Sequence, residues 1–117
     1  MKSALRALAL VVILALLGLM LGPATTVESS VSGIDKVGHV AAFFLISVCL
    51  EILRPAWRGR RVVVLAVLIG AAVELIQGQV GRDASWADLA ADLAGAVAAW
   101  ALTPVLRPLL DWMAARD

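Results

Sequence analysis

Four long runs of apolar residues, separated by short polar segments, make up most of the chain. Each run is long enough to form a helix that crosses the hydrocarbon core of a bilayer, which takes about 17–25 residues. A helix satisfies every backbone hydrogen bond within its own segment, as a lipid environment requires. The pattern predicts four transmembrane helices, at about residues 5–22, 37–53, 62–79 and 86–106.

The amino-acid composition indicates the same class of protein. Of the 117 residues, 62% are hydrophobic and 16% are charged, whereas soluble domains have roughly 45–50% apolar and about 25% charged residues. A single small domain has too little interior to bury so much apolar surface. The formal net charge of +1 disfavours both disorder and nucleic-acid binding. We therefore expect one all-α domain over residues 1–117, a four-helix membrane bundle.

The first apolar run has a second interpretation, a cleaved signal peptide, because a basic start precedes an apolar core. This core is long for a signal peptide, and residues 21–25 offer no clear pair of small residues for cleavage. Gly18 and Gly22 also have the spacing of small residues that lets membrane helices approach closely. We predict that the first helix is retained.

The distribution of lysine and arginine predicts the orientation, because cytoplasmic loops are enriched in these residues. Two of the ten, Lys36 and Arg82, lie in the first and third loops. The other eight lie in the N-terminus, the second loop and the C-terminal tail: Lys2, Arg6, Arg54, Arg58, Arg60, Arg61, Arg107 and Arg116. Both termini are therefore expected in the cytoplasm, with residues 22–36 and 78–86 facing outward.

Polar residues of the predicted helices gather toward this outer side. In chain order they are Asp35, Lys36, His39, Glu74, Gln77, Ser85, Asp88 and Asp92. The cytoplasmic half has nothing comparable beyond its arginines. The functional site is therefore expected in the outer half.

Two acidic residues lie well inside their helices, where a charged side chain costs about 2.5–3.5 kcal/mol. They are Glu74 and Asp92, and a functional role explains this cost better than packing does. His39 has two balanced interpretations, an imidazole oriented by Asp35 one turn away or a packed core residue. For Asp35 and Lys36, interaction with the helix dipole and snorkelling are the simpler explanations.

The start of the fourth helix combines a capping signal with two acidic residues. Ser85 and Asp88 match a capping box. Asp88 and Asp92 are four residues apart, so their like charges either repel or recruit a cation. Arg82, in the preceding loop, is the expected counter-charge.

Other signatures of catalysis or metal binding are missing from the sequence. There is no Gly-rich phosphate loop, no GxSxG elbow and no HExxH helix. One cysteine, Cys49, and one histidine, His39, exclude an internal disulfide and a zinc site built from Cys and His. Neither a metal nor another cofactor is therefore predicted. A triad of Ser85, His39 and an aspartate can be drawn, but the spacing does not support it.

The segment Asp35-Lys36-Val-Gly-His39-Val-Ala-Ala-Phe43-Phe44 resembles the opening motif of the VanZ-like family of small bacterial membrane proteins. Later elements follow in the family's order within residues 34–99: Glu74-Leu-Ile-Gln77, Arg82, Ser85, Asp88, Asp92 and Gly95. The chain departs from the family at Asp92, where Asn is often found, and at Ala99, where a second glycine is common. A proton-sharing or cation-binding role of Asp92 therefore does not follow from the resemblance.

The resemblance implies a four-helix fold and a place in the bacterial cytoplasmic membrane. The founding member of the family is associated with resistance to the glycopeptide teicoplanin, through an activity that is not established. The family name therefore implies a cell-envelope context and leaves the reaction open.

Three functions are compatible with these residues. The first is binding of a lipid headgroup or a lipid-linked envelope intermediate, by Asp35, Lys36, His39, Glu74, Gln77, Arg82, Ser85, Asp88 and Asp92. The second is an intramembrane enzyme acting on such a lipid, with His39, Glu74 and Asp88 as catalytic residues. The third is a proton- or ion-coupled transporter, which with four helices would require a homo-oligomer. A purely structural polar network is the remaining alternative. Membrane lipids are the expected partners in each case.

Overall fold

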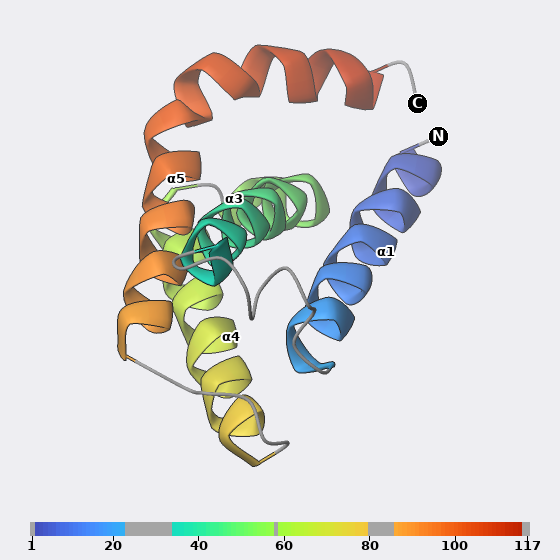
Figure 1. Ribbon diagram of the computed structural model, residues 1–117. Coiled ribbons are helices and arrows are strands. Elements are labelled where there is room, and N and C mark those ends of the chain that lie inside the picture. The colour runs from blue at the N-terminus through green and yellow to red at the C-terminus, as the bar shows by residue number, and fades with distance from the viewer. Residues whose placement is uncertain (1, 23–33, 58, 80–85, 116–117) are drawn as a thin grey trace.

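The computed structural model describes residues 2–22, 34–57, 59–79 and 86–115. They form four α-helices and one 3-10 turn: α1 (Lys2–Leu21), α3 (Ile34–Leu53), η1 (Pro55–Trp57), α4 (Arg60–Gln79) and α5 (Trp86–Ala115) (Figure 1). No strand occurs in these ranges. The prediction of an all-α fold with four long helices is confirmed.

All four α-helices are long and apolar enough to cross a membrane. A 20-residue helix, the length of α1, α3 and α4, spans about 30 Å and so matches the thickness of the hydrocarbon core. Large apolar side chains face outward on each helix, and Leu19 and Leu75 are 68% and 73% exposed. A surface of this kind is suited to contact with lipid.

The fourth helix is longer than the sequence predicts. Instead of ending near residue 106, α5 continues through Pro104 and Pro108 to Ala115. A proline inside a helix removes one backbone hydrogen bond and clashes with the preceding turn, which bends the helix. Figure 1 shows this bend, beyond which α5 runs across the end of the bundle. A straight helix of 30 residues would be about 45 Å long, more than the hydrocarbon core requires.

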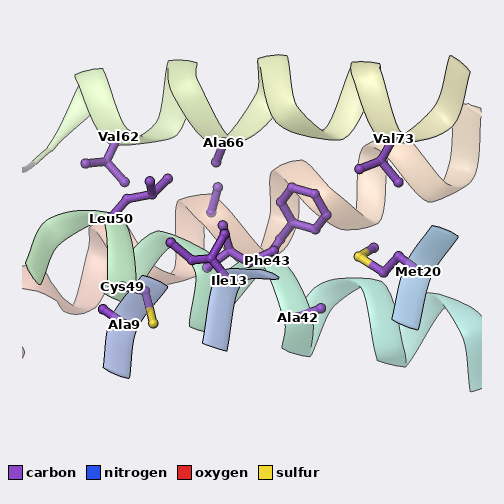
Figure 2. Close-up of a cluster of buried hydrophobic side chains, with 12 residues drawn as sticks. Ala9, Ile13, Met20, Ala42, Phe43, Cys49, Leu50, Val62, Ala66 and Val73 are labelled. Carbon is purple, nitrogen blue, oxygen red and sulfur yellow. The ribbon is translucent and has the colours of Figure 1, made fainter. Parts of the chain in front are cut away.

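The first three long helices run in alternating directions. Leu50 of α3 lies beside Val62 of α4 at one end of the close-up in Figure 2, and Ala42 and Val73 lie at the other end. The last turns of α1 and α4 therefore lie at the same end of the bundle as the first turn of α3. The first turn of α5 joins them there, because its polar side chains contact α3.

The apolar core lies between α1, α3 and α4, and α5 contributes Ala96 to it. Phe43 and Ile46 of α3 are fully buried, as is Ala66 of α4. In Figure 2 the ring of Phe43 is directed toward α4. Gln77 also connects two helices, since its side-chain Nε2 donates a hydrogen bond to the carbonyl oxygen of Met20 in α1 (2.7 Å).

Helices α3 and α5 approach each other closely at Gly95. A Cβ atom at this position would overlap the carbonyl oxygen of Val40 and would lie 2.9 Å from the backbone nitrogen of Phe44. Only glycine permits such an approach between two helix backbones. The contact brings the first turns of α3 and α5 together, and those turns hold polar side chains.

Candidate functional site

Four titratable side chains from three helices converge where α1 and α4 end and α3 and α5 begin. We call them the His39 cluster: His39 of α3, Glu74 of α4, and Asp88 and Asp92 of α5. They are between 1% and 9% exposed. Single ligand atoms of His39, Glu74 and Asp88 all lie within 4.8 Å of one another. Burying so many ionisable groups in a membrane protein costs free energy, so their convergence makes this end of the bundle the candidate functional site.

His39 and Asp92 of the cluster are in direct hydrogen-bonding contact. The imidazole Nδ1 lies 2.6 Å from the carboxylate Oδ1. An ionised carboxylate only accepts hydrogen bonds, so Nδ1 is the nitrogen that donates. In the neutral imidazole, the lone pair is then on Nε2, which lies 3.9 Å from Oδ2 of Asp88. Asp92 therefore fixes both the orientation and the tautomer of His39.

The second oxygen of Asp92 lies against α4. Within the described residues this oxygen, Oδ2, is buried without a hydrogen-bond partner. It lies over Gly70, where an added Cβ atom would be 2.9 Å away. The absence of a side chain at Gly70 thus leaves the space that the Asp92 carboxylate occupies between α4 and α5.

Lys36 lies at the edge of the cluster and pairs with Asp88. Its Nζ is 2.5 Å from Oδ1 of Asp88, and its side chain is 40% exposed against 4% for Asp88. The other oxygen of Asp88 faces His39. Among the described side chains, three carboxylates of the cluster are thus accompanied by one permanent positive charge.

The other predicted site residues lie elsewhere or outside the described part. Gln77 is buried, but its amide nitrogen binds α1. Arg82, Ser85 and the side chain of Asp35 lie outside the described residues. The predicted capping box and the predicted pairings of Asp35 with His39 and of Arg82 with the acids each involve one of these three residues. They therefore lie outside the described part of the chain.

A second buried polar group lies in the other half of the bundle, where the sequence predicts only arginines. We call it the Glu51 cluster: Ser47, Glu51 and Thr103. Glu51 is 1% exposed, and the hydroxyl of Thr103 donates a hydrogen bond to its Oε1 (2.7 Å). The expectation is therefore wrong for this half. The expectation overlooked Glu51, which lies near the end of the second predicted helix.

The spacing along α3 could have revealed this cluster. His39, Phe43, Ser47 and Glu51 recur every four residues, and residues four apart share one face of a helix. That face is buried along its length. Phe43 separates the two polar clusters on this face, and apolar side chains therefore lie between the acidic groups of the two halves.

The geometry of the His39 cluster permits three kinds of chemistry. Its carboxylates can accept hydrogen bonds from hydroxyl or ammonium groups. The lone pair on Nε2 of His39, next to two carboxylates, can accept a proton or bind a cation.

Comparisons with protein families, with curated proteins and with solved structures give no match for this chain. Function must therefore be inferred from these side chains.

Proposed function

We propose that the protein is a multi-pass protein of the bacterial cytoplasmic membrane that binds the polar headgroup of a lipid, or of a lipid-linked envelope intermediate, at the His39 cluster. The observation that supports the proposal is the convergence of one imidazole and three carboxylates from three helices in a buried position. Each acid costs about 2.5–3.5 kcal/mol within a span. Hydroxyl side chains would connect the helices at lower cost.

The cluster offers a headgroup both acceptors and a donor. Glu74 and Asp88 can accept hydrogen bonds from hydroxyl or amine groups of a sugar or an ethanolamine. Lys36, which is partly exposed at the edge, can reach a phosphate oxygen. The resemblance of residues 35–44 to the opening motif of the VanZ-like family supports a role in the cell envelope.

The proposal requires the His39 cluster to face outward, which follows from the eight-to-two distribution of basic residues. Reporter fusions inserted after Gly33 and at the C-terminus are expected to report opposite sides of the membrane, with the C-terminal fusion active only in the cytoplasm. An alkaline phosphatase fusion that is active at the C-terminus would reverse the orientation and place the cluster on the cytoplasmic side.

Lipid retention by the purified protein tests the binding function. We expect native mass spectrometry of the wild-type protein, reconstituted with phosphatidylethanolamine, phosphatidylglycerol and undecaprenyl phosphate, to show preferential retention of one lipid. Lys36→Ala and His39→Ala should each weaken that retention about tenfold or more, the cost of one charge-assisted hydrogen bond. Arg61→Ala is the matched control, because Arg61 lies in the first turn of α4, far along the helix from Glu74. Equal retention by wild type and both cluster variants would contradict the proposal.

An enzyme is the second candidate, and the His39–Asp92 pair is the observation that favours it. A carboxylate that orients an imidazole leaves Nε2 ready to act as a general base. Cleavage of the retained lipid by the wild-type protein, and its loss in His39→Ala, would establish this alternative. A proton path through one chain is less favoured, because Phe43 lies between the two polar clusters.

A further inference from the structure

We propose that the His39 cluster binds one divalent metal ion, zinc or manganese, through His39, Glu74 and Asp88. One ligand atom of each residue lies within 4.8 Å of the other two. Zinc holds nitrogen and carboxylate ligands at about 2.0–2.2 Å, so ligand atoms in a tetrahedral site are about 3.4 Å apart. Rotation of the three side chains toward a common point closes this difference.

The histidine is already arranged as a metal ligand. Nδ1 donates to Asp92, which leaves the lone pair of Nε2 on the side of Asp88. Metal-binding histidines almost always donate their other ring nitrogen to a carboxylate or a carbonyl, which fixes the tautomer and increases the basicity of the ligand. Asp92 thus has the place of the supporting carboxylate, and it does not itself contact the ion.

A second observation that points to a cation is the unsatisfied carboxylate behind the histidine. Asp92 is 1% exposed, and its Oδ2 is buried without a hydrogen-bond partner in the described part of the chain. A buried carboxylate that lacks a full set of donors is stabilised by a nearby positive charge. An ion on Nε2 of His39 would polarise the imidazole and strengthen its bond to Asp92.

The donor atoms of the cluster are consistent with a divalent ion. One imidazole and two carboxylates form a donor set that suits zinc or manganese, whereas copper(I) and iron–sulfur clusters prefer thiolates.

Such an ion would also explain how a site with three carboxylates can accept a phosphate, and this part of the inference rests on the proposed function. Three protein ligands leave at least one coordination position open to water or to an oxygen of a lipid headgroup. Lys36 binds one oxygen of Asp88 and leaves the other directed toward His39. The ammonium group of Lys36 and the ion could therefore contact the same phosphate.

Metal content of the full-length protein tests the inference. The protein is purified in detergent, treated with a chelator, dialysed against zinc or manganese, and analysed by inductively coupled plasma mass spectrometry. We expect one ion per chain in the wild-type protein. X-ray absorption should show one imidazole nitrogen with oxygen ligands at about 2.0–2.2 Å and no sulfur, which excludes binding at Cys49.

Four variants distinguish a loss of ion binding from a loss of folding. Glu74→Gln and His39→Ala should each lower the affinity for the ion by at least about tenfold, the effect typical of altered metal sites. Glu51→Gln is the matched control, because it removes another buried acid from the other half of the bundle and should leave the affinity unchanged. Asp92→Asn, which keeps a hydrogen-bond acceptor for Nδ1, should weaken binding without removing a ligand.

The inference is overturned if wild-type protein holds no ion after dialysis, whether or not the variants fold. It is also overturned if the ion is bound with equal affinity by wild type and Glu74→Gln, or if X-ray absorption shows a sulfur ligand. Lipid retention before and after chelation distinguishes this failure from failure of the proposed function. If the metal-free protein still retains lipid, only the role of the ion in headgroup binding is refuted. If the protein binds the ion but retains no lipid, only the proposed function is refuted.

Discussion

Replacement of Gly95 by valine is expected to abolish the stable packing of α3 on α5. The new Cβ atom would overlap the carbonyl oxygen of Val40 and crowd the backbone nitrogen of Phe44. Backbone atoms cannot rotate away as side chains do, so the two helices must separate. Overpacking in a core costs about 1–3 kcal/mol even where side chains can adjust, and here we expect more. The fraction of monodisperse protein in detergent and its midpoint of thermal unfolding measure the effect.

Gly38 provides the matched control for this substitution. It lies in α3, as Val40 does, but among the described residues no atom outside its own stretch of helix lies within 4 Å of the position that its Cβ would occupy. Gly38→Val should therefore leave the unfolding midpoint nearly unchanged, since valine is a better helix former than glycine. Equal loss of folded protein in both variants would show that glycine has a general role in these helices and that the α3–α5 contact is not responsible.

The helices could be predicted from the sequence because their signal is local. Uninterrupted apolar runs of membrane-spanning length have few other interpretations, and α1, α3 and α4 begin and end within about three residues of the prediction. The predicted end of α5, near residue 106, was wrong, because the helix continues through Pro104 and Pro108 to Ala115. A proline signals a break in backbone hydrogen bonding, but whether the helix ends or bends depends on what the following residues contact.

The members of the His39 cluster could be identified along the chain, whereas their partners could not. The free-energy cost of placing an acidic side chain within a membrane span identifies Glu74 and Asp92 as candidates. The pairing of His39 with Asp92 depends on the crossing of α3 and α5 at Gly95. A crossing of this kind depends on the packing of two helices, and the sequence of either one shows only that a close approach is allowed.

The Glu51 cluster was missed for a related reason. An acid near the end of a predicted span has an inexpensive interpretation, contact with water at the interface. Burial of Glu51 requires a donor from another helix, and Thr103 of α5 supplies it. A lone threonine in an apolar run gives no indication of such a role, because its hydroxyl can donate instead to the carbonyl of the preceding turn, here that of Ala99 at 3.1 Å.

Removal of the Asp92 carboxylate is expected to have the second large effect. His39 and Asp92 have side chains that are 6% and 0% exposed, so Asp92→Leu leaves the Nδ1 proton of His39 buried without an acceptor. A buried donor that is left without its acceptor costs about 1–3 kcal/mol. Asp92→Asn keeps a carbonyl oxygen of nearly the same position and should cost much less. Unfolding of the purified variants by denaturant or heat in detergent measures both changes.

A double variant distinguishes the hydrogen-bonded pair from a simple loss of packing. When both partners of a buried polar pair are replaced by apolar groups of similar size, no unsatisfied group remains and the change is often nearly neutral. We therefore expect His39→Leu combined with Asp92→Leu to be more stable than Asp92→Leu alone, although it lacks one more native side chain. Additive destabilisation would mean that the two residues stabilise the fold independently, despite the 2.6 Å contact between them. Greater stability of the double variant than of the wild-type protein would instead show that the pair is maintained at a cost to the fold, as expected for groups that serve a function.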